Sequence, residues 1–139
     1  MTLAEMLERD EGRVRHAYQD HLGYWTIGVG RLIDERKGGG LSDDEIDYLL
    51  ANDIRRKTAE VAKALPWLSS LNGARQAVLV GMAFQMGTEG LLKFKNTLAM
   101  VQAGDFEGAA KGMLQSLWAR QTPERATRMA EQMRTGEWT

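Results

Sequence analysis

The chain of 139 residues is long enough for one domain, or for two small lobes that share a core, because separate domains usually need about 100 residues each. Hydrophobic residues make up 43% and charged residues 27%, which predicts a folded globular protein and excludes a disordered tail. The net charge of -1 excludes the basic excess typical of nucleic-acid-binding proteins, and the absence of cysteine excludes disulfides and thiolate metal sites.

The first ten residues contain no apolar signal core, and no run approaches the roughly 18 apolar residues of a membrane helix. We therefore expect synthesis in the cytoplasm without a signal peptide, and no association with a membrane. If the substrate lies outside the cytoplasm, another factor must deliver the protein.

A short helix is predicted over the first ten residues, because Thr2 and Glu5 form a capping-box pattern and apolar residues follow at helical spacing. Gly12 should end this helix. Residues 18–32 contain aromatic and β-branched residues between glycines, which predicts a small antiparallel hairpin or three-stranded sheet. Residues 34–40 end in three glycines and are predicted to form a flexible loop.

Helical patterns fill the remainder of the chain. Ser42 and Glu45 form a second capping-box pattern, which begins a helix of about 20 residues with one buried face. Residues 74–84, capped by Asn72, are apolar nearly all round, which predicts the centre of the core. Thr122 is predicted to cap the last helix. The three helices expected after the central one cover residues 96–103, 105–118 and 123–134.

Few residues are candidates for chemistry. His16 and His21 have no other clustered ligands, so they are interpreted as surface histidines rather than as a metal site. Asp10 and Glu11 end the first helix, and Asp20 precedes the glycine-rich hairpin. A glycosidase needs two acids in different environments, one protonated and one ionised. Acids in such places also cap helices and form turns, so residue types alone leave both interpretations open.

Several motifs, separated along the chain, point to one family. In the first quarter of the chain the residues that carry the likeness are Asp10, Glu11, Gly12, Tyr18, Asp20, Gly23, Tyr24, Thr26, Ile27, Gly28 and Gly30. Further along they are Phe84, Gln85, Met86, Gly87, Phe94, Asn96, Leu98, Trp118, Gln121, Thr122, Pro123, Arg125, Ala126, Arg134, Thr135, Gly136 and Trp138. Because these motifs occur in order over nearly the whole chain, the sequence resembles the phage-type lysozymes.

The resemblance implies an α+β, mostly α, lysozyme-like fold within one catalytic domain, residues 1–139. A small lobe of helix plus sheet is expected over about residues 12–41, and a long connecting helix over about 42–63. A helical lobe, over about residues 64–139, should include the N-terminal helix. A cleft is expected between the lobes. The protein should be a monomer that needs no metal and no organic cofactor.

The resemblance also implies an endolysin activity, hydrolysis of the β-1,4 bond between N-acetylmuramic acid and N-acetylglucosamine in bacterial peptidoglycan, with inversion at the anomeric carbon and lysis of the cell. Glu11 is implied as the general acid, and Asp20 with Thr26 as the residues that hold the attacking water. Peptidoglycan glycan strands are the expected partner, and nucleic acid is not.

Four further residues match positions around the family's cleft. Leu32, Phe84 and Thr97 are implied to line the saccharide-binding site, although core packing is the alternative for Leu32 and Phe84. Arg125 matches a basic residue that faces the catalytic glutamate across the cleft, where it is expected to support that residue electrostatically.

The chain departs from the family pattern at Arg31, at Gly112 and in a shorter loop before the long helix. These departures concern cleft contacts and lobe stability rather than catalysis. Two other functions stay open: a lytic transglycosylase, which makes an anhydro sugar, and a wall-binding module without activity. Asp20 with Thr26 favours hydrolysis over the first, and Glu11 argues against the second.

The inverting mechanism makes geometric predictions. The carboxyl groups of Glu11 and Asp20 should lie roughly 6.5 to 9.5 Å apart, which leaves room for a water, whereas a nucleophilic Asp20 would need about 5 to 5.5 Å. Asp20 should be more exposed than Glu11. The Thr26 hydroxyl should lie within one water of Asp20.

Overall fold

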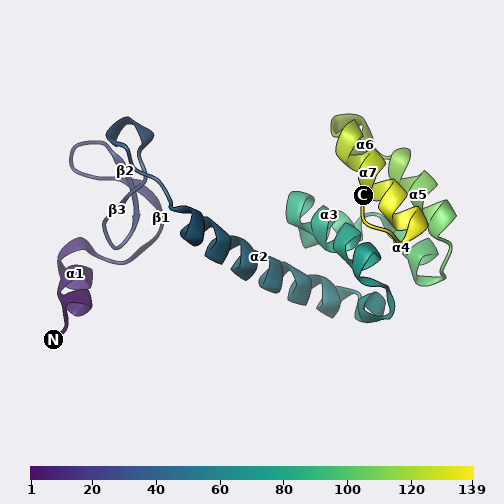
Figure 1. The fold of residues 1–139 in the computed structure, drawn as a ribbon, viewed down its shortest axis with the longest axis horizontal. Coiled ribbons are helices and arrows are strands. Elements are labelled where there is room, and N and C mark those ends of the chain that lie inside the picture. Colours follow the sequence, from purple (N-terminus) through teal and green to yellow (C-terminus); the bar gives the residue numbers. More distant parts are fainter. The chain divides into compact units, whose positions relative to one another are not determined.

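A computed structural model describes residues 1–139, which divide into two units, Met1–Leu49 and Leu50–Thr139 (Figure 1). Seven α-helices and one three-stranded antiparallel sheet make the fold α+β and mostly helical, which confirms the predicted class. None of the helices has both the length and the apolar character of a membrane span. The expected cleft, and the grouping of the N-terminal helix with the helical lobe, depend on how the units are placed and stay predictions.

The first unit begins with helix α1 (Leu3–Glu11), which starts as predicted. The Thr2 hydroxyl accepts the Glu5 N–H at 3.2 Å, and the Glu5 carboxylate accepts the Thr2 N–H at 2.6 Å, so the capping box is complete. The helix ends at Gly12, whose φ of +79° favours glycine. This ending makes Glu11 the last residue of the helix.

The sheet of the first unit has the order β1-β2-β3, from strands β1 (Val14–Gln19), β2 (Trp25–Gly28) and β3 (Arg31–Leu32). Thr26 lies opposite Leu32 in the register of β2 and β3. The predicted three-stranded sheet is confirmed, but it begins earlier in the chain than predicted. The start of β1 consists largely of exposed side chains, so no apolar alternation marks it in the sequence.

Residues 34–40 form a closed turn, so the prediction of a flexible loop is wrong. A short 3-10 helix, η1 (Glu35–Lys37), is capped by Asp34, whose carboxylate accepts the Arg36 N–H at 3.0 Å. The Gly39 N–H donates to the Asp34 carbonyl at 2.9 Å. A Cβ at Gly39 would lie 2.7 Å from a backbone oxygen of β3, so a side chain does not fit there. This glycine serves a close backbone approach rather than freedom of the chain.

Helix α2 (Asp43–Ala64) contains residues of both units and has the predicted length. The Ser42 N–H donates to the Glu45 carboxylate at 2.9 Å, which is one half of the predicted capping box. The Ser42 hydroxyl donates to the same carboxylate at 2.8 Å. Burial of an apolar face is found only near the C-terminal end of α2, at Val61, while Ile54 stays exposed.

The core of the second unit lies among the helices α3 (Gly73–Leu92), α4 (Lys95–Gln102), α5 (Phe106–Leu114), α6 (Leu117–Gln121) and α7 (Pro123–Thr135), preceded by a 3-10 helix, η2 (Pro66–Ser70) (Figure 1). As predicted, Asn72 caps α3: its side chain accepts the Arg75 N–H at 3.0 Å. Leu79 and Met82 of α3 are fully buried. Phe84 is 48% exposed, so α3 is central to the core but not enclosed on every side of the unit.

The single helix predicted over residues 105–118 is wrong, because the structure has two helices, α5 and α6. Ser116 causes the break: its hydroxyl donates to the Met113 carbonyl at 2.7 Å and accepts the Ala119 N–H at 3.2 Å. Thr122 occupies the predicted N-cap position of α7. Its hydroxyl, however, makes no cap bond and donates instead to the preceding helix, at the Trp118 carbonyl.

Candidate active site

Asp20 lies in the turn between β1 and β2 and is held by backbone groups of that turn. Its Oδ1 accepts the N–H groups of Leu22 and Tyr24, both at 2.9 Å. The Tyr24 N–H lowers the pKa of Asp20 below its ordinary value; partial burial opposes this, and the Leu22 N–H adds to the lowering. Asp20 is therefore ionised at neutral pH, and both of these bonds leave Oδ2 free.

Thr26 of β2 is connected to Asp20 through the backbone of Tyr24. The Thr26 side chain is buried, with the residue 6% exposed, and its hydroxyl donates to the Tyr24 carbonyl at 3.1 Å. The same carbonyl accepts the Asp20 N–H at 2.9 Å. Because the Thr26 hydroxyl has already donated its hydrogen, its oxygen is free to accept one from another molecule. That this oxygen lies within one water of Asp20 stays a prediction.

Glu11, the last residue of α1, lies against the turn between β2 and β3. A Cβ built on Gly30 would lie 3.0 Å from both Cδ and Oε2 of Glu11, and Gly30 has a φ of +65°. Within the first unit Glu11 is exposed and Asp20 is half-buried. The order of exposure in the whole protein depends on how the units are placed and stays a prediction. The two backbone N–H groups draw Asp20 against the turn. The distance between the two carboxyl groups stays a prediction.

Of the other predicted site residues, the structure brings only Leu32 next to this group, where it lies opposite Thr26 in the sheet. Phe84, Thr97 and Arg125 belong to the second unit. Arg125 lies in the first turn of α7, and its predicted position facing Glu11 depends on how the units are placed. The interpretation of Arg125 therefore stays a prediction.

Thr97 and Phe84 line different pockets of the second unit. Thr97 lines a pocket of about 560 Å³, and Phe84 lines an apolar groove of about 450 Å³ that also includes Val80 and Trp138. The structure therefore does not bring these two predicted cleft residues together in one pocket.

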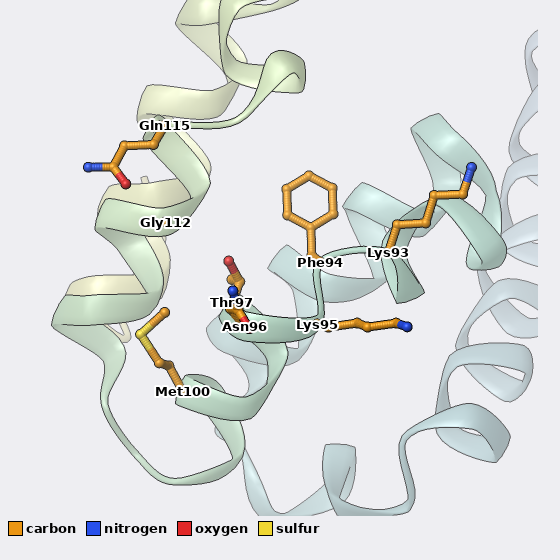
Figure 2. A pocket seen from close by; sticks show the side chains of 8 residues that line it. All are labelled: Lys93, Phe94, Lys95, Asn96, Thr97, Met100, Gly112 and Gln115. Atoms are coloured by element: carbon orange, nitrogen blue, oxygen red, sulfur yellow. The ribbon is translucent and has the colours of Figure 1, made fainter.

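The pocket beside Thr97 combines hydroxyl, amide and aromatic groups from α4, α5 and the segment before α4. Figure 2 shows Asn96 and Thr97 at the start of α4, across from Gly112 on α5 and from Gln115, which follows α5. A Cβ at Gly112 would lie 2.8 Å from the Thr97 hydroxyl oxygen. The departure from the family pattern at Gly112 thus allows Thr97 to lie close to α5. The residues that line the pocket beside Thr97 are Lys93, Phe94, Lys95, Asn96, Thr97, Met100, Gly112 and Gln115.

The departure at Arg31 has a structural partner in the first unit. Its guanidinium forms an ion pair with Glu45 at the start of α2. The N–H and the hydroxyl of Ser42, followed by Arg31, lower the pKa of Glu45 to about 2. Arg31 therefore connects β3 to α2 rather than standing as a free cation.

Sequence analysis did not predict the role of Tyr24 or the bonds of Asp34. Tyr24 acts through its backbone N–H and carbonyl groups, so the role does not depend on its side chain and gives no signal in the sequence. Asp34 is 4% exposed and accepts the Trp25 N–H at 3.0 Å. A signal for Asp34 exists in the sequence, because an aspartate two residues before Arg36 favours a capped turn.

Comparison with known proteins gives one family model and several relatives. The family model described as "Phage lysozyme" matches residues 8–132. The chain is 32% identical to "Probable T4-type lysozyme 1" of Dictyostelium discoideum, covering 97% of this chain and 95% of that protein. It is 35% identical to "Pre-baseplate central spike protein Gp5" of Enterobacteria phage T4, covering 98% of this chain but 28% of that protein. It is 29% identical to "Peptidoglycan hydrolase gp36" of Pseudomonas phage phiKMV, covering 84% of this chain and 13% of that protein.

The mostly helical α+β fold and these matches define a lysozyme-type glycoside hydrolase. More particularly, the chain belongs to the phage lysozyme family, because the family model covers most of it and the Dictyostelium protein matches over nearly its full length.

Proposed function

We propose that the chain hydrolyses the β-1,4 bond between N-acetylmuramic acid and N-acetylglucosamine in bacterial peptidoglycan, with inversion. The observation that carries this proposal is the attachment of the Asp20 carboxylate and the Thr26 hydroxyl to one residue, Tyr24. Glu11 lies in the same unit. The name of the phiKMV relative, a peptidoglycan hydrolase, supports the choice of substrate.

Glu11 is proposed as the general acid. In its protonated form it would donate its hydrogen to the glycosidic oxygen as the bond breaks. Within the first unit, its exposed position at the end of α1 leaves the carboxyl group accessible. Where the Glu11 carboxyl group faces the turn between β2 and β3, the lack of a side chain at Gly30 leaves space for it.

Asp20 and Thr26 are proposed to orient the attacking water. A water that donates one hydrogen to the free Oδ2 of Asp20 and the other to the Thr26 oxygen presents its lone pairs to the sugar. Asp20, which is ionised, can then take the proton as the new bond forms. Attack by this water, from the face opposite to the leaving group, would invert the anomeric carbon.

Leu32, Phe84 and Thr97 are proposed to contact the glycan. The pocket beside Thr97 supports this for one of them, because hydroxyl and amide groups next to the aromatic Phe94 suit the polar edges and apolar face of a sugar ring. For Leu32 the support is its position opposite Thr26. For Phe84 the only support for a contact with the glycan is that the residue is exposed.

The proposal is tested by incubating the purified protein with isolated peptidoglycan. We expect products with reducing muramic acid ends, and NMR spectra taken early in the reaction should show the α-anomer first, since inversion of a β-glycoside gives that anomer. Anhydro ends would identify a lytic transglycosylase instead. The β-anomer would make Asp20 a nucleophile, and binding without products would identify a wall-binding module.

Gly30→Ala is expected to lower the hydrolysis rate by roughly tenfold or more, since displacing a reacting group by about 1 Å can cost about 100-fold. The new methyl group would press on the Glu11 carboxyl group, at 3.0 Å. Gly28→Ala is the matched control, because Gly28 also has a positive φ, +71°, but no atom within 4 Å of an added Cβ. Both variants should lose similar stability, about 1 to 2 kcal/mol from backbone strain, in thermal unfolding. Equal losses of activity would contradict a role for the contact with Glu11.

A further inference from the structure

Asp34 and Arg36, which follow β3, form a bidentate ion pair in which each oxygen of the Asp34 carboxylate accepts two hydrogen bonds. Oδ1 of Asp34 accepts the backbone N–H of Arg36 at 3.0 Å and its Nε–H at 2.9 Å. Oδ2 accepts Nη2 of Arg36 at 2.7 Å and the Trp25 N–H at 3.0 Å. A carboxylate that is 4% exposed is tolerated when its oxygens are satisfied in this way.

The same pair holds the chain on both sides of Tyr24. Nη2 of Arg36 also donates to the Gly23 carbonyl at 3.2 Å, while the Asp34 carboxylate accepts from Trp25. The Arg36 guanidinium lies 5.2 Å from the centre of the Tyr24 ring. In the other direction, the Trp25 carbonyl accepts the Asp34 N–H at 3.1 Å. The residues before and after Tyr24 are therefore fixed by Asp34 and Arg36.

Tyr24 is the residue to which both proposed water-holding groups are bonded. Its N–H donates to Asp20, and its carbonyl accepts the Thr26 hydroxyl. A small rotation of the backbone at Tyr24 would change both bonds together. Restraint of Gly23 and Trp25 by Asp34 and Arg36 limits this rotation.

We propose that Asp34 and Arg36 are positioning residues, which act through the Tyr24 backbone to keep Asp20 and Thr26 in place for the attacking water. This proposal rests on the proposed function in one respect only, namely that Asp20 and Thr26 orient the attacking water. The structural link between the ion pair and the Asp20 carboxylate is independent of which substrate the protein cleaves.

The proposal predicts that the ionisation of Asp20 depends on Arg36. The Tyr24 N–H is the largest influence that lowers the pKa of Asp20, so a less well fixed turn should let this pKa rise. The charged or titratable groups around the turn are His21, Tyr24, Asp34, Arg36 and Lys37, and of these His21 also acts on Asp20. A raised pKa would move the acidic limb of the pH-rate profile to higher pH, because the base must be ionised.

Arg36→Ala in the full chain tests this prediction by NMR titration of the Asp20 carboxyl carbon. We expect the pKa of Asp20 to rise by roughly half a pH unit. On soluble glycan oligomers, kcat should fall several-fold with little change in KM. Asp34→Asn should also raise the pKa of Asp20, because an amide NH2 group replaces one carboxylate oxygen that accepts two hydrogen bonds. An unchanged Asp20 pKa in both folded variants would overturn the proposal.

Two further variants separate positioning from other effects. Arg36→Lys keeps the positive charge but lacks the planar fork, so it should raise the pKa of Asp20 as Arg36→Ala does. A wild-type Asp20 pKa in Arg36→Lys would show that charge alone matters, against the proposal. Glu45→Gln breaks a different carboxylate–arginine pair of the unit, with Arg31, and should leave the Asp20 pKa unchanged. An equal rise there would mean general loosening of the unit and would also overturn the proposal.

The titration needs no substrate, so the two proposals can fail separately. A wild-type protein that does not cleave peptidoglycan would overturn the proposed function, while the Asp20 titration would still decide whether Asp34 and Arg36 fix the turn.

Discussion

Glu11→Gln is expected to reduce peptidoglycan hydrolysis by about 100-fold or more, which is the usual contribution of a positioned general acid. The amide has nearly the shape of the acid and fits beside Gly30, but it cannot supply an acidic proton. Thermal stability should be unchanged or higher. Glu11 is the last residue of α1, where a negative charge is unfavourable next to the carbonyl end of the helix.

Product formation and the unfolding temperature are the two measurements for this variant. Glu8→Gln is the matched control, since it removes an acid of the same helix that is paired with Arg13 on the surface. The control should hydrolyse peptidoglycan at close to the wild-type rate. Near-wild-type turnover by Glu11→Gln would remove Glu11 from the role of general acid.

Asp20→Asn should also reduce hydrolysis by about 100-fold or more, because the neutral amide cannot take a proton from water. Its fold should be retained, since one oxygen of Asp20 accepts both the Leu22 and the Tyr24 N–H, and an asparagine oxygen can do the same. Asp20→Ala should lose activity to a similar extent and, in addition, unfold at a lower temperature, because both N–H groups lose their partner.

Comparison of these two variants separates the charge of Asp20 from its role in the turn. Hydrolysis rates report the charge, and thermal unfolding reports the turn. Substantial activity in Asp20→Asn would show that an ionised base is not needed. An Asp20→Ala variant as stable as Asp20→Asn would show that the turn does not depend on these hydrogen bonds.

The elements that could be predicted from sequence are those with strong local signals. The capping residues of α1 and α3, Thr2 and Asn72, act on N–H groups within the next three residues, so their pattern is visible in a short window. The turn after β3 was not predictable in this way. Asp34 accepts an N–H from Trp25, nine residues earlier, and three glycines in a row suggested freedom of the chain.

The candidate site shows a similar limit. Residue types alone left Glu11 and Asp20 open to ordinary structural roles, and only the resemblance to a family gave them a function. The contribution of Tyr24 could not be predicted at all, because it comes from a peptide group that any residue possesses. The half-burial of Asp20 could not be predicted either, since it comes from hydrogen bonds to the backbone of the turn.

The close approach of Gly112 and Thr97 makes each position a constraint on the side chain at the other. An added Cβ at position 112 would meet the Thr97 hydroxyl at 2.8 Å, so substitutions at the two sites are non-additive. A variant with a side chain at position 112 would need a smaller or rotated residue at position 97. A double variant that changes both positions should therefore be less destabilised than the sum of the two single variants.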